Sequence, residues 1–262
     1  MAGGDVVEAT LTYKRTGEVA LLAHVFGPEE GGTAPSAAIV FFFGGGWTGG
    51  TPTQFYPQCR HLASRGMVAI SAEYRVRDRH GTTPVECVAD GKSAVRWLRA
   101  NAAELGVDPS RVAAAGGSAG GHVAACTALV PGFEEPSEDA GISSVPDALV
   151  LYNPVVDATW GSLSKRFGDR ARALSPRHHI RAGAPPTLIF HGIEDRTVPY
   201  AQVVDFGEAM RSAGNACEVV GFEGQAHGFF NQGRGDGSAF AETLRQTDAF
   251  LTSRGYLVPN DG

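Results

Sequence analysis

The chain has 262 residues, of which 43% are hydrophobic and 19% are charged, and its formal net charge is −6. These values are typical of a globular protein and exclude a disordered chain. Because the basic residues are scattered, the sequence shows no electrostatic footprint for binding nucleic acid or anionic lipid. We therefore expect a neutral or moderately polar small molecule as the partner, and no nucleic-acid or membrane partner.

The first residues lack the basic region followed by an apolar run that a secretory signal needs. The longest apolar stretch, residues 37–43, is too short to span a bilayer. We expect a soluble, cytoplasmic protein, although a trimmed signal peptide is compatible with the sequence. The cysteines form no Cys-x-x-Cys pair, which disfavours a metal or redox site and predicts four buried thiols, with one disulfide left open: Cys59, Cys87, Cys126 and Cys217.

Strands and helices alternate after an antiparallel start. Residues 6–13 and 18–26 are strand-like around a turn at Thr16-Gly17, residues 29–35 form a loop, and the apolar run 37–43 indicates a central strand. Further strands are predicted at 67–74, 112–115, 146–152, 187–191 and 217–222, and helices at 52–65, 84–105, 121–130, 200–213 and 237–254. This order predicts an α/β fold with a mostly parallel sheet of about eight strands and helices on both faces.

We expect residues 1–262 to form a single domain, because α/β folds often use this length around one sheet. Between the predicted strands at 146–152 and 187–191, the chain is rich in polar residues and proline. We interpret this part, at about 154–185, as a short cap-like insertion over the sheet edge with one short helix. It is the candidate for a lid.

Ser118 lies in the run Gly116-Gly117-Ser118-Ala119-Gly120, between a predicted strand and a predicted helix. A Gly-x-Ser-x-Gly run is a weak signal alone, since glycine and serine are common in loops. Between a strand and a helix it is typical of a nucleophile elbow, where the turn is too tight for side chains at its flanks. The sequence therefore predicts that Ser118 is a nucleophile.

A nucleophilic serine needs a base and an acid, which in this strand–turn–helix context follow it in the order acid, then histidine. Asp195 comes directly after a late predicted strand and is the expected acid. The neighbouring Glu194 is the alternative acid, and the alternative role for Asp195 is to cap the following helix. His227 follows the last predicted strand and is the histidine in the right order. We expect His191 to support the Asp195 turn and His122 to pack or cap locally.

Acyl transfer also needs hydrogen-bond donors for the oxyanion. The glycines of Phe43-Gly44-Gly45-Gly46-Trp47 follow the central strand, where backbone amides can supply an oxyanion hole. No phosphate-loop or dinucleotide fingerprint accompanies them, which leaves a flexible turn as the other interpretation. We expect the donors to be the amides of Gly45, Gly46 and Ala119.

Several aromatic residues are candidates for lining an acyl or alcohol pocket, although such residues are more often simple core. The candidates are Trp47, Trp160, Phe229 and Phe230.

Six motifs together resemble the hormone-sensitive-lipase-like and acetyl-esterase branch of the α/β-hydrolase superfamily. They are Phe-Phe-Gly-Gly-Gly-Trp at 42–47, Glu-Tyr-Arg at 73–75, residues 90–98, Gly-Gly-Ser-Ala-Gly-Gly at 116–121, His-Gly-x-x-Asp at 191–195 and Ala-His-Gly-Phe at 226–229. The resemblance implies a carboxylesterase without metal or organic cofactor, usually active on short acyl chains. Ser118, Asp195 and His227 match its triad positions.

The sequence departs from this family at two points. Phe43 stands where the family loop usually has a histidine, so two pairs of oxyanion donors stay open: Gly45 with Gly46, or a pair that includes Trp47. The short N-terminal part leaves no room for the helical cap of larger relatives, so we expect an open site.

Three other functions stay open: a carbohydrate esterase acting on acetylated xylan or feruloyl esters, a peptidase related to prolyl peptidases, and a non-catalytic binding protein on a hydrolase fold. A monomer and a homodimer are both compatible with the sequence.

Overall fold

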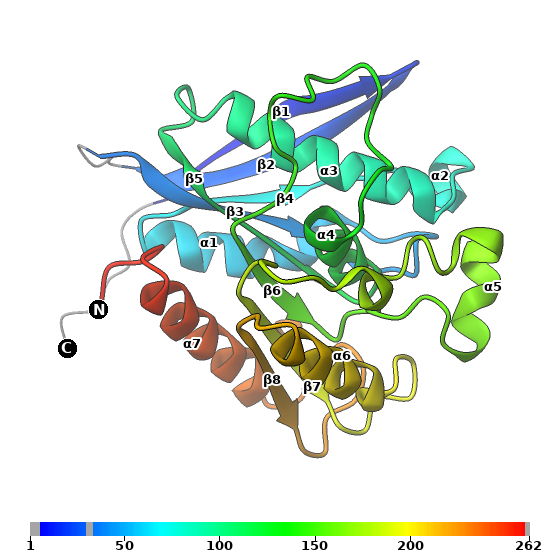
Figure 1. Ribbon diagram of the computed structural model, residues 1–262. Coiled ribbons are helices and arrows are strands. Elements are labelled where there is room, and N and C mark those ends of the chain that lie inside the picture. Colours follow the sequence, from blue (N-terminus) through cyan, green and yellow to red (C-terminus); the bar gives the residue numbers. More distant parts are fainter. Residues whose placement is uncertain (1–5, 30–33, 260–262) are drawn as a thin grey trace.

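A single eight-stranded sheet organises the described residues, 6–29 and 34–259, of the computed structural model (Figure 1). The strand order is β1-β2-β4-β3-β5-β6-β7-β8. The strands are β1 (Val6–Thr16), β2 (Val19–Pro28), β3 (Ser36–Phe42), β4 (Val68–Ala72), β5 (Val107–Gly117), β6 (Ala148–Tyr152), β7 (Thr187–Gly192) and β8 (Cys217–Phe222). The start of the chain and most of the predicted loop at 29–35 lie outside the described residues.

The two N-terminal strands form the predicted hairpin, with Thr16 paired to Val19 across a turn in which Gly17 has a φ of 57°. β1 pairs with β2, and β2 with β4, in antiparallel fashion, whereas all later pairings are parallel. The predicted α/β fold with a mostly parallel sheet of about eight strands is therefore confirmed.

Helices cover both faces of the sheet. The longer ones are α1 (Tyr56–Ser64), α3 (Pro84–Ala100), α4 (Ala119–Leu129), α6 (Tyr200–Ser212) and α7 (Ser238–Ser253). Side chains of α3, α4 and α6 pack with Val40 and Phe42 of β3 in one core cluster, whereas α1 and α7 pack with Ile39 and Phe41 in the other. Alternation along β3 thus supplies both cores, as expected for a strand buried on both faces.

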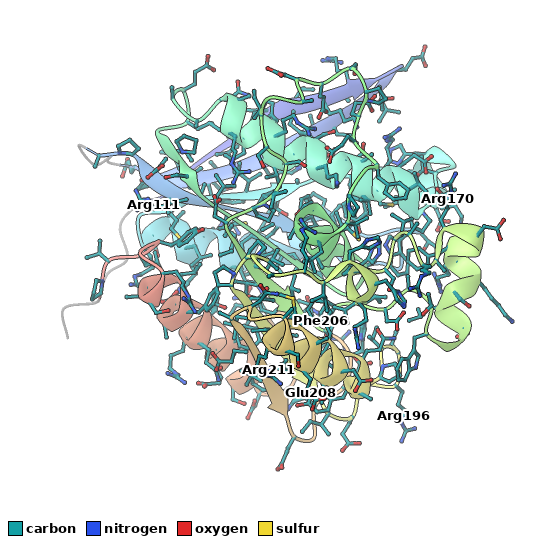
Figure 2. All side chains as sticks on the ribbon, viewed as in Figure 1. Arg111, Arg170, Arg196, Phe206, Glu208 and Arg211 are labelled. Atoms are coloured by element: carbon teal, nitrogen blue, oxygen red, sulfur yellow. The ribbon has the colours of Figure 1, made fainter. Side chains whose placement is uncertain are left out.

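The helices have an apolar side towards the sheet and a polar side towards solvent. On α6, Phe206 is fully buried whereas Glu208 and Arg211 are exposed (Figure 2). All four cysteines are buried free thiols, which confirms the preferred expectation. In the described part of the chain, no helix combines the length and apolar character that crossing a membrane requires.

Two elements differ from the prediction. The helix expected to reach residue 105 ends at Ala100, and the strand expected at 112–115 extends from Val107 to Gly117. The turn-like residues 108–111 lie inside β5, because the pairing with β3 jumps from Ser36↔Val107 to Ala38↔Val112. The extra residues bulge out of the ladder, so a local turn signal coexists with a continuous strand.

Short elements were the hardest to predict. α2 (Arg77–His80) is one turn that ends at Gly81 in the left-handed region, and it was not expected. The segment 154–185 contains α5 (Ser164–Phe167), the 3₁₀ turns η2 (Gly161–Leu163), η3 (Gly168–Arg170) and η4 (Pro176–His179), whereas η1 (Pro52–Phe55) begins the helix expected at 52–65. Elements of one turn do not show a helical repeat of apolar residues, which explains the difference.

A buried ionic cluster joins β1, the loop after β4, and α3. Asp90 on α3 accepts a bidentate pair from Arg75, at 2.7 and 2.8 Å, and lies 2.8 Å from the Lys14 ammonium. Asp90 is completely buried. The Glu-Tyr-Arg motif and the motif that begins at residue 90 therefore meet in one structural contact.

The loops that follow the parallel strands meet at one edge of the sheet. They come after β3, β5, β6, β7 and β8, and carry residues 43–47, Ser118, Asn153, Asp195 and His227. Carboxyl ends of parallel strands are where open α/β sheets build their binding sites.

Candidate active site

Ser118 occupies the sharp turn between β5 and α4. Its φ of 53° and ψ of −117° are unusual for a residue with a side chain. A Cβ at Gly120 would collide with the carbonyl oxygens of Phe42 and Phe43, so glycine is required for the turn to pack against the end of β3. The Ser118 amide also donates to the Tyr152 carbonyl at 2.9 Å, which fixes the turn against β6.

The structure brings Ser118, His227 and Asp195 together. The His227 Nε2 atom lies 2.9 Å from Ser118 Oγ, and Nδ1 lies 2.6 Å from Asp195 Oδ2. The Gly228 amide donates to Asn153 Oδ1 at 3.0 Å, which holds the histidine loop against the end of β6. When a hydroxyl, an imidazole and a carboxylate lie in this spatial order, the imidazole can take the proton of the serine and the carboxylate can stabilise the resulting cation.

The Asp195 carboxylate is buried and well supplied with donors. Its Oδ1 accepts the amides of Thr197 and Val198 at 2.8 and 3.0 Å, and its Oδ2 lies 3.3 Å from His191 Nε2 as well as contacting His227. Burial alone would raise the pKa of Asp195, but hydrogen bonds from His191, His227 and the Val198 amide outweigh it and hold the pKa well below the usual range. The carboxylate therefore stays charged beside the imidazole.

Glu194 and His191, the two neighbours of Asp195 in its motif, differ in burial and contacts. Glu194 is exposed and makes no contact with His227. The buried His191 donates from Nε2 to the Val198 carbonyl at 2.9 Å, which braces the Asp195 turn as expected.

The glycine loop after β3 runs beside the nucleophile, since a Cβ built on Gly44 would lie 3.4 Å from the Ser118 Cβ. The Gly44 amide is occupied, because it donates to Gln54 Oε1 at 2.6 Å. The amides of Gly45, Gly46, Trp47 and Ala119 have no hydrogen-bond partner among the described residues. Gly45, Gly46 and Trp47 line the same cavity as Ser118, and Ala119 follows Ser118 directly, so free donors lie near the hydroxyl, as an oxyanion site requires.

Gln54 connects the two loops that flank Ser118, a role that no sequence motif predicted. Besides accepting from Gly44, it donates from Nε2 to Asn231 Oδ1 at 2.9 Å, and Asn231 in turn donates to the Gly228 carbonyl at 2.8 Å. Gln54 lies in η1 within a segment read only as a helix, so no local signal could have revealed this contact.

Phe43 anchors the glycine loop to Tyr74 in the core. Its buried ring stacks on Tyr74 with centroids 4.2 Å apart, and the Tyr74 hydroxyl donates to the Phe43 carbonyl at 2.6 Å. The loop therefore has an aromatic anchor at the position where the sequence departs from the family histidine. The tyrosine of the Glu-Tyr-Arg motif belongs to this anchor.

Trp47 is held by His122, which is completely buried on α4. The indole Nε1 donates to His122 Nδ1 at 3.3 Å, so the other ring nitrogen, Nε2, donates to the Leu174 carbonyl at 2.7 Å. Burial lowers the pKa of His122 to about 4, although the bond to Leu174 opposes this shift. The neutral imidazole thus joins the glycine loop to segment 154–185.

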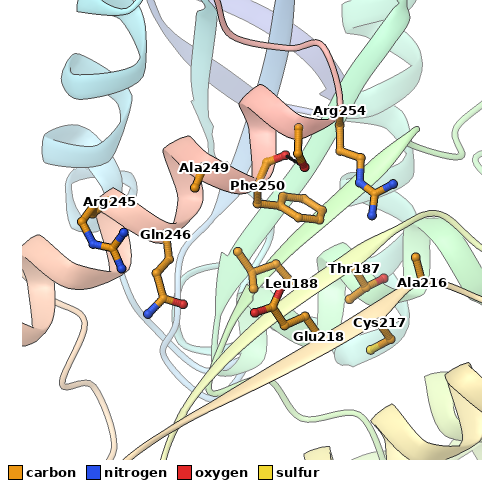
Figure 3. Close-up of a pocket in the computed structure, with 11 residues that line it drawn as sticks. Thr187, Leu188, Ala216, Cys217, Glu218, Arg245, Gln246, Ala249, Phe250 and Arg254 are labelled. Atoms are coloured by element: carbon orange, nitrogen blue, oxygen red, sulfur yellow. Dashed lines mark hydrogen bonds between the residues drawn. The ribbon is translucent and has the colours of Figure 1, made fainter. Parts of the chain in front are cut away.

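A cavity of about 320 Å³, which we call the catalytic cavity, opens beside Ser118 and His227. Gly45, Gly46 and Trp47 line it, and so do Phe230, Leu163 and Arg166, the last two from segment 154–185. A larger cavity of about 510 Å³ lies between α7 and the amino ends of β7 and β8, away from the serine (Figure 3).

Two aromatic candidates lie outside the lining of the catalytic cavity, which corrects their predicted place. Trp160 lines a separate hollow with Asp157 and His178. Phe229 is buried against Phe222 and Phe230, because its position after β8 directs the ring into the second core cluster.

Known proteins that are similar to this chain in sequence and structure include esterases. The chain is 30% identical to Esterase LipC of Mycobacterium tuberculosis over 75% of its own length and 54% of that protein. It is 52% identical to a structure of Thermogutta terrifontis esterase 2 phosphoramylated by tabun, with a TM-score of 0.93 and 97% of both chains covered. It is 50% identical to the propionate-bound esterase from the same species, with a TM-score of 0.92 and 98% and 97% covered.

Fold, site and similarities define a protein with the α/β-hydrolase fold that is related to carboxylic ester hydrolases. The chain belongs to the BD-FAE family, whose model matches residues 24–210, and to the hormone-sensitive-lipase-like carboxylesterase branch that its motifs resemble. It spans about half the length of the first curated mycobacterial relatives, 54%, 45% and 46% of them.

Proposed function

We propose that this protein is a serine carboxylesterase that hydrolyses small esters of short carboxylic acids through an acyl-enzyme. The observation that carries the proposal is the continuous contact from Asp195 through His227 to Ser118, beside a loop with free amides. The cavity that holds Ser118 and His227 also has Gly45 and Gly46 in its lining.

In the proposed first stage, His227 Nε2 takes the proton of Ser118 as Oγ attacks the ester carbonyl. The amides of Gly45, Gly46 and Ala119 stabilise the oxyanion, and Asp195 stabilises the imidazolium. The imidazolium then protonates the departing alcohol. In the second stage, His227 activates a water molecule that releases the acid and restores Ser118.

Two observations support a short acyl chain. The catalytic cavity of about 320 Å³ is small for a ligand site, and Trp47, Leu163 and Phe230 narrow it. The neighbouring Thermogutta terrifontis structures include one titled as propionate-bound and one titled as butyrate-bound. Leu163 and Arg166 come from segment 154–185, so we propose that it acts as a short cap on a single domain of residues 1–262.

The test is a kinetic series of p-nitrophenyl esters from acetate to hexadecanoate, with wild type and Ser118→Ala. We expect a burst with the short esters, falling activity with chain length, and a loss of about six orders of magnitude in kcat for the variant. A fluorophosphonate probe should label wild type and not the variant. Full esterase activity of Ser118→Ala, or activity that rises steadily to hexadecanoate, would contradict the proposal.

We further propose a small-molecule ester as the only partner, a cytoplasmic location, and a monomer or homodimer. Light scattering after gel filtration distinguishes these two states from larger assemblies, and fractionation of the source cells tests the location.

A further inference from the structure

A second, cation-rich cavity of about 260 Å³ adjoins the catalytic cavity. We call it the outer cavity. It shares Gly46, Trp47 and Arg166 with the catalytic cavity, so the two lie side by side along the glycine loop. Arg166 stands at the junction, where its Nη1 donates to the Gly46 carbonyl at 3.0 Å.

The lining of the outer cavity carries three cations and no carboxylate. Arg77 and Lys165 join Arg166 there. Lys165 and Arg166 form no ion pair within the described residues, whereas Arg77 lies 3.2 Å from the exposed Asp78. A second acid, Glu86, is engaged with the amide and hydroxyl of its capping partner on α3 and does not line the cavity. The outer cavity therefore has an excess of positive charge.

A hydroxyl in the same lining lacks a partner. Thr82 Oγ1 is buried and makes no hydrogen bond within the described residues. The other two hydroxyls of the lining are occupied, since Thr48 donates to the Gly45 carbonyl at 2.9 Å and Thr83 to Glu86 at 2.6 Å. A buried hydroxyl without a partner is uncommon in native proteins, so Thr82 is a candidate donor to a ligand bound in this cavity.

From this arrangement we infer that the preferred substrates are esters that also carry a carboxylate, such as monoesters of dicarboxylic acids. This inference rests on the proposed esterase function and names its substrate class. The reacting ester lies at Ser118, and the free carboxylate extends past Gly46 into the outer cavity. There, Arg166 offers a planar pair of donors that matches a carboxylate, and Lys165 and Arg77 add positive charge.

The chemistry stays that of ester hydrolysis. With a monomethyl dicarboxylate, Ser118 Oγ forms a bond to the ester carbonyl, the bond to the methoxy oxygen breaks, and methanol leaves with the proton from His227. Water then adds to the acyl-enzyme and releases the dicarboxylate, and the distal carboxylate takes no part in bond making. A net charge of −6 for the whole chain makes this local excess of cations a specific feature rather than a general one.

The experiment compares kcat/KM for monomethyl esters of succinate, glutarate and adipate with neutral methyl esters of matched length. We expect the charged ester to be favoured at one chain length at least about tenfold in low salt. The double variant Arg77→Gln/Lys165→Gln should reduce this ratio about tenfold, because exposed ion pairs contribute up to a few-fold each. Added salt should reduce the ratio as well.

Arg170→Gln is the matched control, because this exposed arginine belongs to the same segment but lines neither cavity (Figure 2). It should leave the ratio as in wild type. Two results would overturn this proposal alone. In one, the neutral esters are hydrolysed and the ratio of kcat/KM for charged to neutral esters is one or less. In the other, the double variant has the same ratio as wild type. Loss of hydrolysis of both kinds of ester overturns the esterase function together with it.

Discussion

Gln54 touches both loops between which an ester must bind. Its amide group accepts from Gly44 and donates to Asn231, so one side chain sets the distance between the glycine loop and the loop of His227. The hydrogen bond from the Gly44 amide to Gln54 also aligns the glycine loop, and the amides of Gly45 and Gly46 stay unpaired. Gln54 is therefore a positioning residue in our proposal.

Replacing Gln54 with leucine keeps the volume but removes both hydrogen bonds. We expect kcat to fall about tenfold to a hundredfold with KM nearly unchanged, since small displacements of reacting groups cost rate rather than ground-state binding. Steady-state kinetics with p-nitrophenyl acetate measure this. Gln246→Leu on α7, far from both loops, is the control, and a wild-type kcat in Gln54→Leu would remove the role assigned here.

His122 predicts a pH dependence of folding stability. Its folded pKa, lowered by burial to about 4, lies below the 6.5 of a free imidazole, so the unfolded chain binds a proton that the folded chain excludes between these values. The contribution to stability is therefore complete above about pH 6.5 and declines as the pH falls to about 4. A shift of this size corresponds to ~3 kcal/mol.

Denaturant titrations from pH 4 to 7 test this with His122→Gln, whose amide can still bridge Trp47 and Leu174. The variant should lose less stability on acidification than wild type by an amount of that order. Parallel stability curves for the two proteins would show that His122 is not the group responsible.

At the scale of elements, three parts of the fold depend on one carboxylate. Asp90 on α3 neutralises Arg75 and Lys14, both largely buried, so β1 and the loop after β4 are joined to the helix through it. We expect Asp90→Ala to lower the free energy of unfolding by about 3–5 kcal/mol, because Arg75 loses its ion-pair partner and Lys14 keeps only Glu135, 3.1 Å away. Guanidinium unfolding monitored by circular dichroism measures the loss.

Asp78→Ala is the comparison for that variant, since its pair with Arg77 is exposed. It should cost less than about 1 kcal/mol. Equal losses in the two variants would mean that burial of the Asp90 cluster has no bearing on stability.

Strands and long helices followed from sequence because their signals are local. The apolar run at 37–43 and the helical spacing after Pro84 predicted β3 and α3, and the order of motifs predicted which side chains would meet. Contacts that join distant loops could not be predicted from the sequence. Gln54, Tyr74 and Asn231 act through partners more than ten residues away or on other loops, and no periodic pattern marks such pairs.

The places of the aromatic side chains were also only partly predictable from the sequence. Trp47 lies in the catalytic cavity as expected, because its backbone belongs to the glycine loop. Trp160 and Phe229 do not, because one-turn elements and the direction of the chain after β8 decide where their rings point. Composition indicated that rings were available, but only the fold determined which of them line the cavity.

At the scale of the whole molecule, activity and stability place opposite demands on one residue. The left-handed backbone of Ser118 stores strain, which for a residue with a side chain costs about 1–3 kcal/mol. Ser118→Gly should release it and Ser118→Ala should not, so we expect the glycine variant to unfold at a higher denaturant concentration than the alanine variant, although both lack the nucleophile. Equal midpoints would mean that the turn carries no such cost. The difference between the two variants would show how much stability this protein gives up to hold a side chain in place at the nucleophile position.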